Sequence, residues 1–106
     1  MTSRFEAIYR SSLEDPEGFW AAAAEQVDWY RKWDRVLDDS NKPFYRWFEG
    51  GVVNSCHNAL DRHVASGRGA QPALIYDSPV TGTVASFSYA EMRDWVARAA
   101  GMLAAA

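Results

Sequence analysis

The sequence predicts an α+β fold in which helices predominate, with about four helices and one small antiparallel β-hairpin. Apolar residues recur every three or four positions in four segments, and this spacing places them on one face of a helix. Between the last two of these segments, two short runs rich in β-branched and aromatic residues flank a turn, which is typical of a hairpin.

The first two helices are expected over residues 3–13 and 15–28. Ser3 and Glu6 have the spacing of a capping box, in which a hydroxyl and a carboxylate three residues apart bind the free backbone N–H groups. Asp15-Pro16 restarts the chain as a second helix, because Asp is a favoured N-cap and proline is favoured at the first helical position.

Residues 29–53 form the least regular part of the sequence, because aromatic side chains alternate there with turn-forming residues. We expect a long connection with a short extended piece near residues 44–48, closed by a turn at Gly50-Gly51. Long loops without secondary structure are unusual in compact domains. We therefore expect this one to wrap over another part of a larger protein.

The third helix is expected to begin at Asn54 and to end at Gly67 and Gly69. Its apolar stripe consists of Cys56, Ala59, Leu60, His63 and Val64. The hairpin follows, with strands at residues 73–77 and 83–87 around a turn at 78–82.

The final helix is expected to start with a second capping box, Ser88 and Glu91. Its apolar stripe consists of Met92, Trp95, Val96, Ala99, Met102 and Leu103. The pattern runs to Ala106 without a Gly or Asn cap or a basic last turn. We therefore expect residues 1–106 to be one domain of a longer chain.

Composition excludes several classes of partner. The net charge of -3 argues against a nucleic-acid partner, which requires clustered basic residues. No stretch approaches the ~20 apolar residues of a membrane span, and the first residues do not resemble a signal peptide. The single cysteine, Cys56, has no partner for a disulfide, so we expect a reducing, cytoplasmic location.

No catalytic, cofactor-binding or metal-binding residue is predicted. His57 and His63 lie six positions apart, so on one helix they point in different directions, and Cys56 beside His57 cannot form a dyad for the same reason. The turns at Gly50-Gly51 and Gly67–Gly69 lack the motif of a phosphate-binding loop. The remaining candidates for a nucleophile or an acid–base pair are expected to be helix caps, turn residues and surface residues. They are Ser78, Ser86, Ser88, Glu14, Asp15, Asp38, Asp39 and Asp61.

The aromatic series from Phe19 to Phe48 is the main candidate for a function. Ordinary packing explains it as well as a docking surface does, since Trp, Tyr and Arg are enriched where proteins bind one another. A membrane-surface role is weaker, because the second helix has alanines where a bulky apolar face would be needed. Exposed apolar residues also predict self-association of the isolated chain.

Specific strings resemble the N-terminal domain of the acetyl-CoA synthetase family, the AMP-forming acyl-CoA synthetases. The strings are Phe19-Trp20 with Trp29 and Trp33, Arg46–Gly51, Val53-Asn54, Asn58–His63, Pro72–Gly82 and Phe87–Met92. The run Asn58–His63 is the most specific, since the family reads N-x-L-D-R-H there. The turn at Tyr76–Gly82 is most similar to the propionate–CoA ligase branch, where acetate enzymes more often have W-E-G.

The resemblance implies that residues 1–106 are an N-terminal subdomain of a larger adenylate-forming enzyme, ending before the AMP-binding domain. The enzyme would convert propionate, ATP and CoA to propionyl-CoA, AMP and pyrophosphate with magnesium. The family's catalytic parts follow this region, so the chain alone is expected to be inactive and to have the AMP-binding domain as its partner. Acetate or another short-chain acid as the substrate, and a stand-alone interaction module, remain the alternatives.

Overall fold

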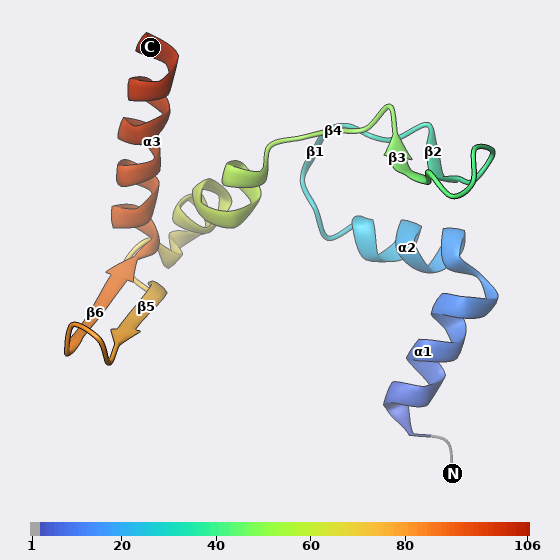
Figure 1. Cartoon of the computed structure of the whole chain (residues 1–106), viewed down its shortest axis with the longest axis horizontal. Coiled ribbons are helices and arrows are strands. Elements are labelled where there is room, and N and C mark those ends of the chain that lie inside the picture. Colours follow the sequence, from blue (N-terminus) through green and yellow to red (C-terminus); the bar gives the residue numbers. More distant parts are fainter. Residues whose placement is uncertain (1–2) are drawn as a thin grey trace. The chain divides into compact units, whose positions relative to one another are not determined.

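The computed structural model describes residues 3–106. The chain divides into two compact units, residues 1–54 and 55–106. Helices and short antiparallel strand pairs make up both units (Figure 1). The predicted α+β class with predominant helices is therefore confirmed. Within residues 3–106, no helix has the length and apolar character needed to cross a membrane.

The first unit begins with helices α1 (Arg4–Glu14) and α2 (Pro16–Ala24). The Ser3 hydroxyl accepts a hydrogen bond from the backbone N–H of Glu6, and Asp15 caps α2 in the same way. Only half of the first expected capping box forms, because the Glu6 carboxylate accepts a bond from the Arg10 guanidinium instead.

Helix α2 ends at Ala24, not near Asp28 as its periodicity predicts. The backbone N–H of Val27 bonds the Ala24 carbonyl across 3.1 Å, and the indole Nε1 of Trp29 donates to the same oxygen across 2.9 Å. These two bonds satisfy the carbonyl that a further helical turn would need, so the chain leaves the helix.

Residues 29–53 are not a structureless connection, and this prediction is wrong. They form two antiparallel pairs: β1 (Trp29–Arg31) with β4 (Val52–Val53), and β2 (Arg35–Asp38) with β3 (Arg46–Glu49). The expected extended piece near 44–48 corresponds in part to β3, and the turn at Gly50-Gly51 is present between β3 and β4. The strands pair across the chain, so local periodicity does not reveal them.

The second unit starts with a helical segment from Ser55, as expected, but it contains two wide π-helical turns, His57–Asp61 and Val64–Arg68. Gly67, at a φ of 88°, ends its regular winding. The predicted hairpin is confirmed as β5 (Pro72–Ser78) and β6 (Thr83–Ser88). Helix α3 (Tyr89–Ala105) follows, with the complete predicted capping box at Ser88 and Glu91.

The core of both units is thin. Among residues 3–106 only Ala24 and Val36 are buried, and both belong to the first unit. In the second unit the best-packed rings are only half-covered, with Phe87 and Trp95 at 4.8 Å between centroids and His63 and Tyr89 at 4.9 Å. Many large apolar side chains therefore remain in contact with water.

Candidate functional site

In the first unit, Trp20, which also meets Phe19 edge to face at 5.2 Å, is linked through ring contacts to four further rings, and we call these five rings the aromatic cluster. Its members are Trp20, Trp29, Trp33, Trp47 and Phe48. Trp20 comes from α2, the next two from β1 and the turn after it, and the last two from β3. The aromatic series singled out from the sequence is thus brought together in space.

Three rings make the inner part of the aromatic cluster. The centroid distances are 5.1 Å from Trp29 to Trp33, 5.5 Å from Trp29 to Phe48 and 5.3 Å from Trp33 to Phe48. These distances lie within the range of favourable edge-to-face and tilted aromatic pairs. All three rings are half-buried. The ammonium of Lys32 lies 5.0 Å from the centre of the Trp33 ring, which adds a cation–π contact.

Phe48 holds its ring in this group with an uncommon backbone. Its φ is 51°, in the left-handed region that costs a bulky residue about 1–3 kcal/mol. Two backbone hydrogen bonds maintain it, from Gly51 N–H to the Phe48 carbonyl (3.0 Å) and from Asp34 N–H to the Glu49 carbonyl (2.9 Å). The surrounding strand pairs therefore determine where the Phe48 ring lies.

The turn that follows Phe48 is closed by side chains. Arg31 donates from Nη1 to the carbonyl oxygen of Gly50 at 2.7 Å and from Nη2 to the Asp34 carboxylate at 2.9 Å. A Cβ atom on Gly50 would meet this carboxylate, and its φ of 79° also favours glycine. The Arg31–Asp34 ion pair therefore fixes the turn at Gly50.

Part of the aromatic cluster borders a cavity of about 260 Å³, which we call the aromatic pocket. Trp20, Trp47 and Phe48 line it. Trp20 and Trp47 meet edge to face at 6.2 Å and are 43% and 46% exposed. Among the described residues 3–106, no charged side chain lines this pocket. The sequence gives no signal for the contact, because Trp20 and Trp47 lie on elements far apart in the chain.

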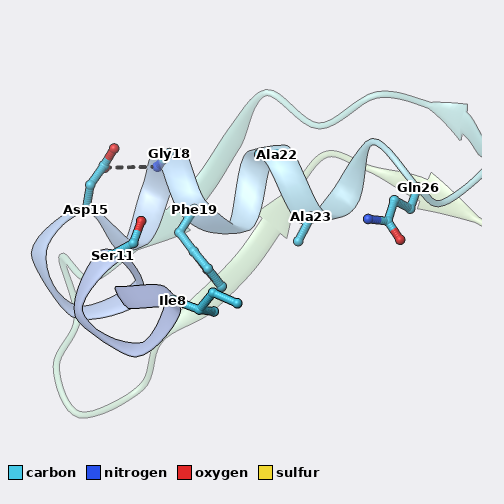
Figure 2. Close-up of a pocket in the computed structure, with 8 residues that line it drawn as sticks. All are labelled: Ile8, Ser11, Asp15, Gly18, Phe19, Ala22, Ala23 and Gln26. Atoms are coloured by element: carbon cyan, nitrogen blue, oxygen red, sulfur yellow. Dashed lines mark hydrogen bonds between the residues drawn. The ribbon is translucent and has the colours of Figure 1, made fainter. Parts of the chain in front are cut away.

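A second, more open groove of about 530 Å³ runs between α1 and α2 (Figure 2). Ile8 and Phe19 supply its apolar side, and their side chains point toward one another in Figure 2. Asp15 at one end is the N-cap of α2, and its carboxylate accepts a hydrogen bond from the backbone N–H of Gly18 at 3.0 Å. The groove is therefore lined by apolar side chains together with the exposed, N-capping carboxylate of Asp15.

Cys56 is a half-buried thiol with a partner that disfavours its ionisation. Its Sγ lies 3.7 Å from Oδ2 of Asp61 and donates to it. Burial, the negative charge of Asp61 and this hydrogen bond raise the pKa of the thiol above its ordinary value of 9.0. The position near a helix N-terminus, which favours a thiolate, is outweighed.

The two histidines occupy different positions in the helical segment. His63 contacts the Tyr89 ring and hydrogen-bonds the Arg68 guanidinium through Nδ1. His57 begins the first π-helical turn. Across residues 3–106, no three or more His, Cys, Asp or Glu side chains are grouped so that they could hold a metal ion.

The remaining carboxylates and hydroxyls serve local structure. The Asp38 carboxylate accepts a hydrogen bond from Ser40 N–H at 3.1 Å. Its hydrogen bonds to Ser40 are the main cause of its lowered pKa, and the charges of Arg35 and Arg46 lower the pKa further. The Asp39 carboxylate pairs with Lys42 at 2.8 Å, and this partner lowers its pKa. The Ser78 hydroxyl accepts from Thr81 N–H.

The most specific string of the sequence, Asn58–His63, winds through the first π-helical turn. Arg62 donates from Nη1 to Oδ1 of Asn58 at 3.2 Å, and Asp61 holds the Cys56 thiol. A family model described as acetyl-coenzyme A synthetase N-terminus matches residues 5–59.

The chain belongs to the acetyl-coenzyme A synthetase N-terminus family.

Individual relatives of this family cover nearly the whole chain. The human mitochondrial acyl-CoA synthetase short-chain family member 3 is 46% identical over 101 residues, which are 95% of this chain and 15% of that protein. The acetyl-coenzyme A synthetase of Burkholderia mallei is 42% identical over 100 residues, 93% of this chain and 15% of that protein. The chain thus spans about 15% of the length of these curated relatives.

The fold is also found in a solved structure of the same family. The acetoacetyl-CoA synthetase from Streptomyces lividans superposes with a TM-score of 0.79 at 33% identity. The match covers 97% of this chain and 16% of that chain. An acetyl-coenzyme A synthetase N-terminus of this fold therefore occurs there as a small part of a much longer polypeptide.

Proposed function

We propose that the chain is the non-catalytic, N-terminal docking part of an AMP-forming short-chain acyl-CoA synthetase. The observation that carries this proposal is the unfinished core: among residues 3–106 only Ala24 and Val36 are buried. A domain that completes its packing against the rest of an enzyme buries few residues on its own, because its apolar side chains are covered only by that second surface.

The accessible area supports the same view. The chain of 11.9 kDa exposes 8185 Å². Two independent folded bodies of half that mass each would together expose about 7,200 Å². An excess of this size is comparable with one side of a standard protein interface, about 800 Å².

The proposed reaction is the ligation of propionate to CoA with conversion of ATP to AMP and pyrophosphate. When bound, ATP with magnesium would supply the adenylyl group that activates the carboxylate, with pyrophosphate as the leaving group, and CoA would supply the accepting thiol. The described residues do not fit a resident metal ion, since no three or more His, Cys, Asp or Glu side chains among residues 3–106 are grouped to hold one. We therefore give no residue of this chain a role in binding the metal.

The choice of propionate rests on the resemblance at Tyr76–Gly82, which spans the end of β5, the turn and the position before β6. Acetate is the alternative, and the names of relatives include both acetyl and acetoacetyl enzymes. The side chain of Val80, at the tip of this turn, is 94% exposed.

A stand-alone interaction module is the second candidate function. The exposed aromatic residues of the first unit favour it, since such residues dominate binding energy at protein interfaces. The reading frame of the gene distinguishes the two: an in-frame phosphate-binding loop downstream supports the enzyme, whereas a stop codon directly after Ala106 supports the module.

We propose a cytoplasmic location from the unpaired Cys56. The human relative is mitochondrial by its name, so the mitochondrion is the alternative where the source cell has one. Fractionation of cells expressing the tagged full gene product distinguishes the two locations.

The test is an assay of AMP release in three samples. The chain alone should show no propionate-, acetate- or acetoacetate-dependent AMP release. A fusion of the chain to the part of the Burkholderia mallei enzyme that follows its matched segment should release AMP with acetate. The full-length gene product should prefer propionate. Turnover by the chain alone contradicts the proposed function, and a preference for acetate in the last sample contradicts only the choice of acid.

A further inference from the structure

The proposed function gives no specific role to the aromatic pocket, which lies between α2 and β3. We propose that this pocket receives one apolar side chain, of about the size of Leu, Met or Phe, from the AMP-binding domain (the adenylating domain) of the same polypeptide. This inference rests on the proposed function and deepens it, since it names the surface through which the docking part is attached.

The pocket is fixed before anything binds. Phe48 is one of its three lining rings, and the half-buried rings of Trp29 and Trp33 pack against Phe48 with centroids at 5.5 Å and 5.3 Å. The left-handed backbone of Phe48 is maintained by the strand pairs around it. Uncommon backbone conformations of this kind cluster where proteins bind ligands. A rigid pocket lowers the entropy that its occupant must lose.

The chemistry of the pocket selects its occupant. Only Trp20, Trp47 and Phe48 line it, so it offers no partner for a charged or strongly polar group. Its volume of about 260 Å³ lies below the range of about 300–1,000 Å³ for small-molecule sites. A single large apolar side chain fits this size. Half-exposed Trp side chains around such a pocket are typical energetic centres of protein interfaces.

The adenylating domain is favoured over a second copy by the lengths of the relatives. The chain corresponds to 15% of the curated relatives and 16% of the Streptomyces lividans enzyme. In that solved chain the same fold is joined to a polypeptide several times its size. A partner tethered in this way is present at a high effective concentration, which a free second copy does not match.

The experiment measures hydroxyl-radical modification of the natural rings by mass spectrometry. The chain alone, at low concentration, is compared with the fusion to the Burkholderia mallei enzyme described above. Modification of Trp20 and Trp47 should fall in the fusion by about fivefold, the ratio between rings 43–46% exposed and fully buried ones. Phe44, a 73% exposed ring of the same unit outside the pocket, is the internal control and should change less.

A matched pair of variants sharpens the test. Trp47→Ser should raise modification of Trp20 by a larger factor in the fusion than in the chain alone, because the chain alone loses only the neighbouring Trp47 ring, whereas the fusion also loses the occupant. Phe44→Ser should leave Trp20 protected. If the fusion does not fold, the same measurement is made on a mixture of the chain with the Burkholderia mallei enzyme lacking its own matched segment.

Each outcome decides a separate point. Unprotected Trp20 and Trp47 in a fusion that turns over acetate overturn the pocket and leave the proposed function intact. Protected rings in an inactive fusion support the pocket and contradict the proposed function. Protection of Phe44 equal to that of both Trp residues overturns the assignment to the pocket. Protection that rises with the concentration of the chain alone overturns it in favour of a second copy.

Discussion

The indole nitrogen of Trp29 donates a hydrogen bond to the main-chain carbonyl of Ala24 across 2.9 Å. Ala24 is one of the two buried residues among residues 3–106 and the last residue of α2, while Trp29 is the first residue of β1 and a member of the aromatic cluster. This bond therefore joins the end of the helical half of the first unit to the start of its strands.

Removing the bond should weaken the first unit. Trp29→Phe keeps an aromatic ring but leaves the partly buried Ala24 carbonyl with one partner fewer, so the free energy of unfolding should fall by about 1–2 kcal/mol. Urea denaturation followed by far-ultraviolet circular dichroism measures it. Trp20→Phe makes the same change at a half-exposed ring and should cost less; equal costs would show that the hydrogen bond contributes nothing.

The capping box of α3 should make stability depend on pH. The Glu91 carboxylate accepts from Ser88 N–H at 2.8 Å, and the bonds to Ser88 lower its pKa below the ordinary value of 4.5. Because the folded-state pKa is depressed, the stabilisation is complete above pH 4.5 and is lost as the pH falls through the folded-state value.

Glu91→Gln tests this directly. The variant should be less stable than the wild-type chain at pH 7, and the difference should narrow steadily as denaturation is repeated below pH 4.5. Ser88→Ala should cost about 1 kcal/mol at pH 7, because it removes the hydroxyl that caps the Glu91 N–H. A difference between wild type and Glu91→Gln that stays constant from pH 7 to low pH would refute the linkage.

Two glycine-to-alanine substitutions should change the stability of the chain in opposite directions. Gly50→Ala should destabilise the first unit by about 1–2 kcal/mol, because its φ is 79° and the added Cβ meets the Asp34 carboxylate. Gly101→Ala lies in α3 with nothing within 4 Å of the added Cβ, and should stabilise α3 by about 0.5–1 kcal/mol. Chemical denaturation of both variants checks the pair, and a neutral Gly50→Ala contradicts the geometry of the turn.

Cys56 should react slowly with thiol reagents. Burial and Asp61 raise the pKa of its thiol, so alkylation by iodoacetamide at pH 8 should be slower in the folded chain than in urea. Asp61→Asn removes the nearby charge and should increase the rate, whereas Asp77→Asn in β5 should leave it unchanged. If Asp61→Asn reacts no faster than the wild-type chain, the carboxylate is not the cause.

The elements that the sequence predicts well are those stabilised by near neighbours. The hairpin closes through a short turn that ends with the pair Ser78 and Thr83, and α3 starts with a capping box three residues long. Both depend on residues a few positions apart. Their spacing in the sequence therefore carries the information needed to predict them.

The strand pairs of the first unit depend on distant partners. Trp29 pairs with Val53 and Arg35 with Glu49, and nothing local in residues 29–53 indicates either register. The early end of α2 at Ala24 has the same origin, because the bond from Trp29 overrides a helical period that continues toward Asp28.

The aromatic pocket shows the same division between what could and could not be predicted. The richness of residues 19–48 in aromatic side chains is visible in the sequence, and it correctly indicates a group of packed rings. The position of Phe48 could not be predicted, because its left-handed backbone accompanies the contacts of its ring with Trp29 and Trp33. A positive φ at a Phe residue has no signature in the sequence.

The most direct measurement compares two proteins: the Burkholderia mallei acetyl-coenzyme A synthetase lacking its matched segment, and the same truncated enzyme to which this chain is joined. We predict acetate-dependent AMP release that is weak in the first and restored in the second, with no release by this chain alone. Full activity of the truncated enzyme, or a folded fusion no more active than it, would contradict the account.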